Sequence, residues 1–147
     1  MKIALGADHA GFELKDNLAS LLRDEGHQVE DHGTGSSASV DYPEYAAAVG
    51  QAVQNGSADL GILVCGTGVG IGIAANKIKG IRAAICNDIF TAGMARAHND
   101  ANVLALGARV VGPGVAEEIV RAFLTTEYEG GRHSRRVGKI HALEDHE

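Results

Sequence analysis

Residues 60–77 read LGILVCGTGVGIGIAANK, and this stretch decides the fold. Its first residues, Leu60 to Val64, form a continuous apolar run, which is typical of a strand buried on both faces of a parallel sheet. Glycines break the run at Cys65, and the residues after the break predict a helix that packs closely on the strand. A turn without bulky side chains exposes backbone N–H groups beside the Cys65 thiol. Such a turn favours the binding of an anion.

The rest of the chain alternates between apolar strand patterns and helical spacing. Besides 60–64, strands are predicted at 2–8, 28–32, 81–86 and 103–106, and helices at 12–25, 45–53, 91–98, 115–124 and about 133–145. No internal repeat or linker interrupts the alternation. The sequence therefore predicts one domain over residues 1–147, a Rossmann-like three-layer α/β/α sandwich around a five-stranded parallel sheet.

The composition narrows the class of function. Of the 147 residues 45% are hydrophobic, and the formal net charge of −6 argues against a broad nucleic-acid-binding surface. We expect no membrane segment, because no apolar stretch has spanning length and no cleavable signal pattern precedes the first strand. The two cysteines, Cys65 and Cys86, lie on separate apolar runs. We therefore expect the reducing cytoplasm as the location.

Polar residues follow the predicted strands at their carboxyl ends, where ligands bind in an open parallel sheet. We expect these residues, and those that end the helix before the last strand, to meet at one rim. They are Asp8 and His9 after the first strand, Cys65 to Gly68 after the third, Asn87 and Asp88 after the fourth, Gly107 to Arg109 after the fifth, and His98 and Asn99 at the end of the helix.

The residues alone leave more than one interpretation of the glycine turn. Cys65 is either a small buried apolar side chain or a thiol whose pKa falls below about 8.5 at the helix start, which makes it a usable base. A nucleotide-binding module is the rival function, because residues 70–75 match a degenerate dinucleotide fingerprint and Asp88 stands near the distance of a ribose-binding acid. That match falls inside the predicted helix, and no Gly-Lys-Ser/Thr phosphate loop is present.

The histidines do not predict a metal site. His27 and His32 flank a predicted edge strand, and His141 and His146 lie in the tail. None of them shows a three-ligand spacing, so no metal ligand is assigned.

Seven motifs keep a fixed order along nearly the whole chain: Asp8-His9-Ala10-Gly11, Asp41-Tyr42-Pro43, residues 65–70, Ala74-Ala75-Asn76-Lys77, Arg82-Ala83, residues 98–102 and Glu129-Gly130-Gly131-Arg132-His133. Together they resemble the ribose-5-phosphate isomerase B family, which also includes the galactose-6-phosphate isomerase subunits. The resemblance implies a cofactor-free aldose–ketose isomerase that interconverts ribose 5-phosphate and ribulose 5-phosphate through an enediolate. A six-carbon sugar phosphate, galactose 6-phosphate or allose 6-phosphate, is the alternative substrate.

The resemblance also implies a role for each matching residue. Cys65 is the base that moves the proton between carbons, Thr67 orients or relays at the hydroxyl end, and His98 opens the sugar ring. The remaining residues bind substrate: Asp8 and Asn99 at the hydroxyls or the enediolate, the N–H groups of Gly66, Gly68, Val69 and Gly70 at the enediolate oxygens, and His9, Arg109, Arg132 and Arg136 at the phosphate, with Tyr42 as a hydroxyl donor. Four-residue spacing places the last two arginines on one helical face.

Finally, the resemblance implies a homodimer, or a dimer of dimers, with shared active sites. The C-terminal helix is expected to pack on the partner subunit. The Cys65 turn is expected to face His98, Asn99 and Arg109 of the partner subunit, together with the terminal arginines.

Overall fold

The computed structural model describes residues 1–145 and contains five strands in one sheet. Its spatial order is β2-β1-β3-β5-β4, and every neighbouring pair is parallel. The predicted five-stranded parallel sheet is therefore confirmed. The strands are β1 (Lys2–Ala7), β2 (Gln28–Asp31), β3 (Leu60–Cys65), β4 (Ala83–Ile85) and β5 (Val103–Gly107).

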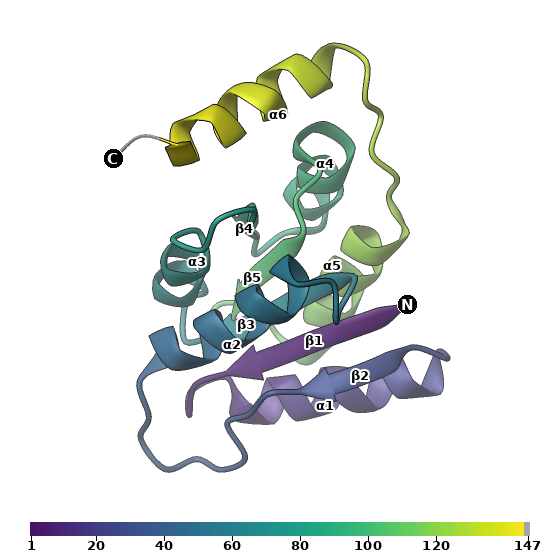
Figure 1. Ribbon diagram of the computed structural model, residues 1–147. Coiled ribbons are helices and arrows are strands. Elements are labelled where there is room, and N and C mark those ends of the chain that lie inside the picture. Colours follow the sequence, from purple (N-terminus) through teal and green to yellow (C-terminus); the bar gives the residue numbers. More distant parts are fainter. Residues whose placement is uncertain (146–147) are drawn as a thin grey trace.

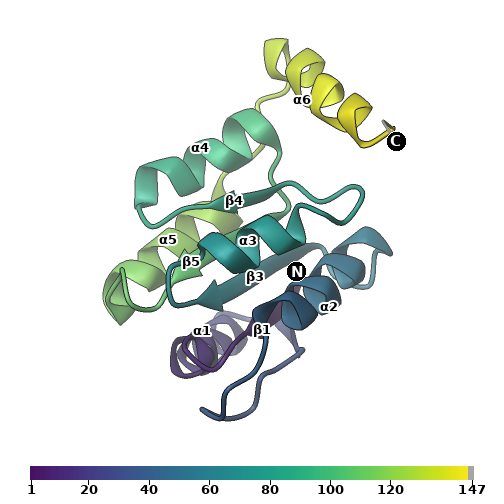
Figure 2. The same cartoon turned by 90° about the vertical axis from the view of Figure 1, so that its left-hand side faces the viewer.

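Helices cover both faces of the sheet, which gives the three layers visible in Figures 1 and 2. Residues of α1, α4 and α5 join the hydrophobic core on one face, and residues of α2 and α3 join the core on the other. The helices are α1 (Phe12–Asp24), α2 (Tyr42–Gln54), α3 (Val69–Ala75), α4 (Ile89–Asn99), α5 (Pro113–Thr125) and α6 (Arg132–Ala142), followed by the short 3-10 helix η1 (Leu143–Asp145).

Strand β3 supplies side chains to both cores. Ile62 and Val64 belong to one core, whereas Leu63 and Cys65 belong to the other. Successive side chains of a strand point to opposite faces, so a strand covered on both sides must be apolar at every position. This explains why the run 60–64 shows no alternation.

Most predicted elements differ from the structure by one or two residues at an end, and the differences in α2, β4 and α6 are as follows. Helix α2 begins at Tyr42 rather than at residue 45, because Asp41 takes the extended conformation of a helix-capping residue and Pro43 lies in the first turn, which tolerates proline. Strand β4 covers only Ala83–Ile85 instead of 81–86. The terminal helix spans Arg132–Ala142 and continues as η1, instead of running from 133 to 145.

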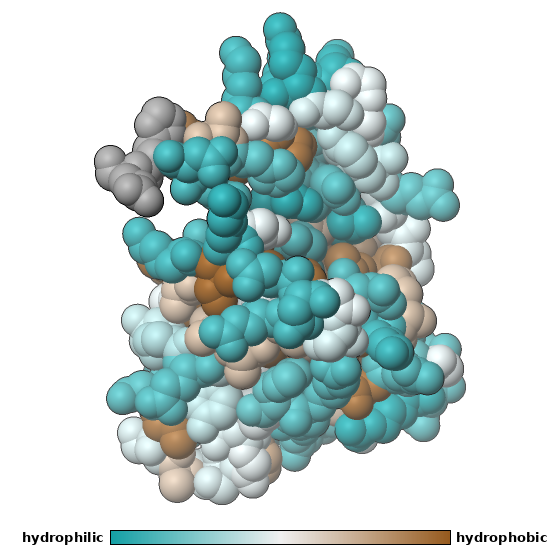
Figure 3. Space-filling model, viewed as in Figure 1, coloured by the Kyte–Doolittle hydropathy of each residue, from teal (hydrophilic) through white to brown (hydrophobic). Residues whose placement is uncertain are grey.

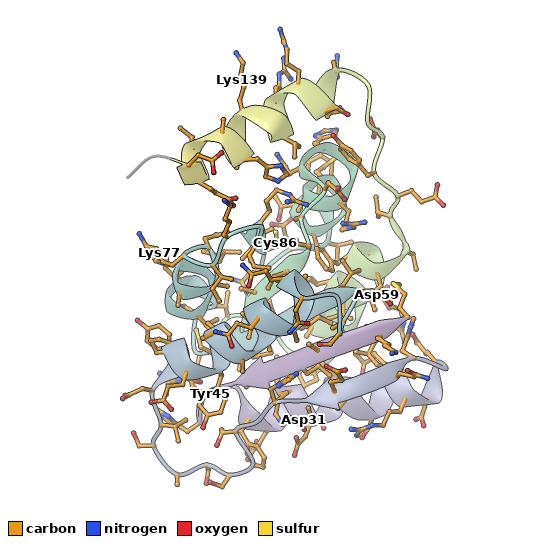
Figure 4. The ribbon with its side chains drawn as sticks, in the orientation of Figure 1. Asp31, Tyr45, Asp59, Lys77, Cys86 and Lys139 are labelled. Carbon is orange, nitrogen blue, oxygen red and sulfur yellow. The ribbon has the colours of Figure 1, made fainter. Side chains whose placement is uncertain are left out.

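Helix α6 stands apart from the sandwich and packs mainly against α4 (Figures 1 and 2). Its buried side chains are His133 and Val137. A cavity of about 820 Å³ separates α6 and η1 from the body, and Ile140 and Leu143 line its upper side. Figure 3 shows apolar surface at the bottom of this hollow. Lys139 points away from the body on the outer side of α6 (Figure 4).

No helix within residues 1–145 is both long and apolar enough to cross a membrane. His146, one of the tail histidines, and Glu147 lie outside the described residues.

Candidate active site

The Cys65 turn is held by a hydrogen bond to the sulfur. Cys65 ends β3 and is buried, and the N–H of Gly68 donates to its Sγ at 3.1 Å. Gly68 has φ +82°, and a Cβ there would lie 2.9 Å from the carbonyl carbon of Leu106. Only glycine meets both conditions without strain. The glycine in this turn therefore sets the position of the N–H that faces the thiol.

Two further contacts tie the turn to the end of β5. The N–H of Arg109 donates to the Gly66 carbonyl at 3.0 Å. The Asn87 amide donates to the Thr67 carbonyl at 3.1 Å and accepts from the Gly107 N–H at 2.8 Å. Asn87 was noted at a strand end but assigned no role, because an amide that bridges two loops has no signature in sequence. It holds the two loops in register.

The hydrogen-bond donors of the turn divide into two groups. The N–H of Val69 donates to Oγ1 of Thr67 at 3.1 Å, which leaves the Thr67 hydroxyl proton available for a ligand. The N–H groups of Gly70 and Ile71 make no hydrogen bond within residues 1–145. An oxyanion above the turn would therefore meet these groups, while the N–H of Gly68 is already directed at the sulfur.

Asp8 presents one free carboxylate oxygen beside the turn. It is buried, and its Oδ1 accepts hydrogen bonds from the N–H groups of Ala10 and Gly11 at 3.0 and 3.1 Å. A Cβ at Gly11 would lie only 2.4 Å from the carbonyl oxygen of Val64, so the start of α1 is pressed against β3. Oδ2 of Asp8 remains free to accept from a substrate hydroxyl.

The neighbouring His9 has a defined tautomer. Its Nδ1 lies 3.2 Å from the N–H of Val40, which can only donate. Nδ1 is therefore the acceptor, and the hydrogen-bond network assigns the proton of the neutral ring to Nε2. That Nε2–H is free to donate to an anion.

Tyr42 and Arg109 flank the turn on the same chain. A Cβ at Gly70 would lie 2.6 Å from Cζ of Tyr42, and a Cβ at Gly66 would lie 3.3 Å from a guanidinium nitrogen of Arg109. The expectation that Arg109 reaches the turn from a partner chain is therefore wrong, since the Arg109 next to Gly66 belongs to the same chain. Arg109 comes shortly after β5, and β5 lies beside β3 in the sheet, so Arg109 lies near the residues that follow Cys65.

His98 and Asn99 lie at the opposite end of the sheet from Cys65. Helix α4 returns antiparallel to the strands, so its last residues reach the amino end of β4. Arg82, which immediately precedes β4, donates to the carbonyls of Asn99 at 3.1 Å and of Asp100 at 2.7 Å. The prediction of a single rim is therefore wrong within one chain. The strand ends were placed correctly, but the helix that follows a strand ends at the other edge.

His98 belongs to a second group of polar residues. Its ring stacks on that of His133, with centroids 4.4 Å apart and planes inclined by 12°. Glu129 approaches both rings, with carboxylate oxygens 4.0 Å from Nε2 of His98 and 3.6 Å from Nε2 of His133. Neither Glu129 nor His133 was assigned a role from sequence, although both lie in one of the seven motifs. Their contact with His98 depends on how α6 folds back against α4.

The terminal arginines point away from the body of their own chain. Arg132, Arg136 and Lys139 recur at a spacing of four and three residues, which places them on one face of α6. Arg132 and Arg136 are exposed, and Lys139 on the same face points outward (Figure 4). This positively charged face of α6 is therefore available to a ligand or to another chain.

Asp88 and Cys86 have structural roles. Both carboxylate oxygens of Asp88 accept hydrogen bonds from Thr91, at 2.7 Å from its N–H and 2.6 Å from its hydroxyl, so Asp88 caps α4. These hydrogen bonds hold the pKa of Asp88 below its ordinary value. Burial raises the pKa of the Cys86 thiol and outweighs the hydrogen bond with Thr91, which lowers this pKa. Burial therefore favours the neutral thiol. Asp88 already accepts hydrogen bonds from Thr91, and residues 70–75 lie inside α3 rather than in a turn. Neither of the two observations behind the nucleotide-binding interpretation therefore favours it any longer.

The comparisons with known proteins agree along the whole chain. The ribose-5-phosphate isomerase B of Escherichia coli K12 is 54% identical over 143 residues, which cover 97% of this chain and 96% of that protein. The structure of Clostridium thermocellum ribose-5-phosphate isomerase B matches with a TM-score of 0.97 and 53% identity, over 98% of this chain and 97% of that one. A second structure, of ribose-5-phosphate isomerase B from Mycoplasma genitalium with bound ribulose-5-phosphate, has a TM-score of 0.94 and 42% identity and covers 99% and 97% of the two chains. The sequence model of the ribose/galactose isomerase family matches residues 3–140. The chain is a sugar-phosphate isomerase and belongs to the ribose/galactose isomerase family.

Proposed function

We propose that this protein interconverts ribose 5-phosphate and ribulose 5-phosphate without a cofactor, with Cys65 as the base. The observation that carries the proposal is the turn after β3, where the Gly68 N–H faces Sγ and free N–H groups stand beside it. The relatives named above are ribose-5-phosphate isomerases, and the Mycoplasma genitalium structure holds ribulose-5-phosphate.

The reaction needs one group that moves a proton between neighbouring carbons. A Cys65 thiolate would take the proton from C2 of the open aldose and return it to C1, and the hydrogen bond from Gly68 can persist throughout because sulfur remains the acceptor. The enediolate oxygens would be stabilised by N–H groups of the turn, since those of Gly70 and Ile71 have no hydrogen-bond partner among residues 1–145. The Thr67 hydroxyl and Oδ2 of Asp8 would orient the sugar hydroxyls.

The phosphate needs several cationic or donor groups at the far end of the sugar. His9 would donate through its Nε2–H, Arg109 supplies a guanidinium on the same chain, and Tyr42 supplies a hydroxyl. A dianion of this kind binds most strongly to guanidinium groups. Arg132 and Arg136 complete the set if they come from a second chain.

A second copy of the chain is therefore part of the proposal, as a homodimer or a dimer of dimers. Cys65 lies at the carboxyl edge of the sheet, whereas His98 and Asn99 lie at the amino edge, so one chain cannot bring both to one sugar. Twofold symmetry would place the His98 end of each chain against the Cys65 turn of the other. Exposed apolar side chains near α3 and β4 support an interface there: Val69, Ile73, Ile85, Ile89 and Phe90, of which Phe90 is 73% exposed.

We also place the protein in the cytoplasm. Cys65 and Cys86 are both free thiols, and the proposed mechanism requires Cys65 to stay reduced.

Substitution of the base tests the proposal directly. Cys65→Ala should lower kcat for ribose 5-phosphate by about 10²–10⁴-fold, the usual contribution of a positioned base. Cys86→Ala, which removes the other buried thiol, is the matched control and should keep the wild-type rate. An unchanged rate in Cys65→Ala would show that another group moves the proton.

A further inference from the structure

The second polar group contains the ligands of a transition-metal site. We define the imidazole cluster as His98 at the end of α4, Glu129 in the connection to α6, and His133 in the first turn of α6. One ligand atom from each residue lies within 4.8 Å of the others. Gly130 and Gly131, with φ of 64° and 57°, make the turn that folds Glu129 back against the ring of His133.

The donor set suits Zn²⁺. Two imidazoles and one carboxylate are a common protein ligand set for zinc, with a fourth position left for water. Zinc–ligand bonds of about 2.0–2.2 Å require ligand atoms roughly 3.4 Å apart in a tetrahedral site. The cluster must therefore contract by up to about 1.4 Å from its present spacing.

The exposure of two of the three side chains permits that contraction. His133 is only 9% exposed and is fixed by packing, whereas the side chains of His98 and Glu129 are 39% and 57% exposed. The rings now stack, so their lone pairs do not converge on one point. Rotation of the His98 ring would direct its Nε2 at the position between Glu129 and His133.

We propose that the imidazole cluster binds one Zn²⁺ per chain and that the bound ion reversibly inhibits the enzyme by occupying His98. Binding joins α4 to α6 through the metal, where these two helices already pack together. The inhibition rests on the proposed function, because it assumes that His98 opens the sugar ring. The binding does not.

A titration of metal-free protein with Zn²⁺ against a chromophoric chelator tests the site itself. Thiolates bind zinc as well, so the parent for this titration is the Cys65→Ser/Cys86→Ser protein. It should bind one Zn²⁺ per chain. Glu129→Gln and His133→Asn should each weaken binding by at least about tenfold, since even the loss of a group that only supports a ligand costs that much.

Glu127→Gln is the matched control, because Glu127 is exposed on the same connection and lies outside the cluster. It should bind Zn²⁺ like the parent. Equal binding by the parent and the Glu129→Gln protein, or no binding by the parent, would overturn the site. Should His133→Asn fail to fold, Glu129→Gln decides alone, because its side chain is largely in solvent.

The zinc dependence of Glu129→Gln distinguishes zinc on His98 from zinc on Cys65. In the enzyme with both cysteines, Zn²⁺ should slow the conversion of ribose 5-phosphate, and Glu129→Gln should need at least about tenfold more zinc for the same inhibition. Glu127→Gln should need no more zinc than the wild type. Equal zinc sensitivity of Glu129→Gln and the wild type would assign the effect to Cys65 and overturn the inhibition. If the enzyme with both cysteines does not convert ribose 5-phosphate, while the parent still binds zinc at the cluster, the proposed function is refuted and the site stands.

Discussion

The N–H of Gly68 donates to Sγ of Cys65 at 3.1 Å, and the backbone that presents it has φ +82°. A side chain at position 68 would meet the backbone of Leu106 and strain the left-handed conformation. The position of the Gly68 N–H, the left-handed backbone at Gly68 and its close approach to β5 are thus possible only because residue 68 has no Cβ.

Gly68→Ala should consequently affect both stability and catalysis. We expect the free energy of unfolding to fall by about 1–3 kcal/mol, from the strained backbone alone, and kcat to fall as the turn moves relative to Sγ. Urea unfolding and steady-state kinetics measure the two effects. Gly112→Ala is the control, because Gly112 has φ −75° and open space around its Cα; equal behaviour of the two variants would contradict the role of Gly68.

Shared active sites predict complementation between two inactive variants. Cys65→Ala and His98→Asn homodimers should each convert ribose 5-phosphate slowly. After mixing and subunit exchange, a heterodimer carries both changes in one site and none in the other, so about a quarter of the wild-type activity should return. If mixing restores nothing although mass spectrometry shows heterodimers, each site is built from one chain.

The apolar surface near β4 gives an independent test of the assembly. Phe90→Glu should shift the sedimentation coefficient to that of a monomer and abolish the conversion of ribose 5-phosphate, because a charge cannot be buried unpaired in an interface. Val115→Glu alters another exposed apolar residue, on α5, and should leave the dimer intact. A fully active Phe90→Glu monomer would refute the shared site.

The ion pair between Lys15 and Asp31 predicts a pH-dependent stability. Lys15 is 1% exposed, and its Nζ lies 2.7 Å from both carboxylate oxygens of Asp31. Burial raises the pKa of Asp31, but the hydrogen bonds from Lys15 and the Gly33 N–H, with the charge of Lys15, outweigh it and hold this pKa below its ordinary value. The native state thus favours the ionised form, so the contribution is complete above about pH 4 and is lost as the pH falls through the lower native pKa.

Asp31→Asn should lower the free energy of unfolding at pH 7 by about 1–3 kcal/mol, because it leaves the buried ammonium poorly paired. Asp16, 3.1 Å from the same Nζ, provides partial compensation. Urea unfolding at pH 7 and pH 3 should show the difference from wild type shrinking at the lower pH. Asp24→Asn changes an exposed carboxylate on α1, the helix that carries Lys15, and should show no such dependence on pH.

Chain length of the sugar is the sharpest test of specificity. An extra carbon in a fitted pocket changes discrimination by about 1–3 kcal/mol. We expect kcat/KM for ribose 5-phosphate to exceed that for allose 6-phosphate and galactose 6-phosphate by at least about tenfold. A preference for either six-carbon phosphate would reassign the substrate and leave the proposed chemistry unchanged.

The sequence predicted the sheet and the Cys65 turn because their causes are local. An apolar run such as 60–64 is typical of a strand covered on both faces, and the glycines after Cys65 mark where a helix approaches it. The start of α2 at Tyr42 was missed, because the apolar spacing indicates a helix only from residue 45, although proline is tolerated in a first helical turn. The turn's hydrogen bond to sulfur depends on a single φ value that no residue pattern reports.

The position of His98 shows where reasoning from residues fails. Its sequence neighbours place it at the end of a helix, but only the direction of that helix decides which edge of the sheet it reaches. Its contacts with Glu129 and His133 join residues more than thirty positions apart and depend on the docking of α6 against α4. Long-range packing of this kind leaves no local pattern.

The separation of Cys65 and His98 to opposite edges of one sheet has a consequence for how the enzyme behaves on dilution. If each chain carries two half-sites that it cannot join to each other, the activity per chain is a function of protein concentration. It should decline once the concentration drops below the dissociation constant of the pair, while every chain remains folded. The folded monomer would then be an inactive form of the enzyme that becomes active when it binds a second copy.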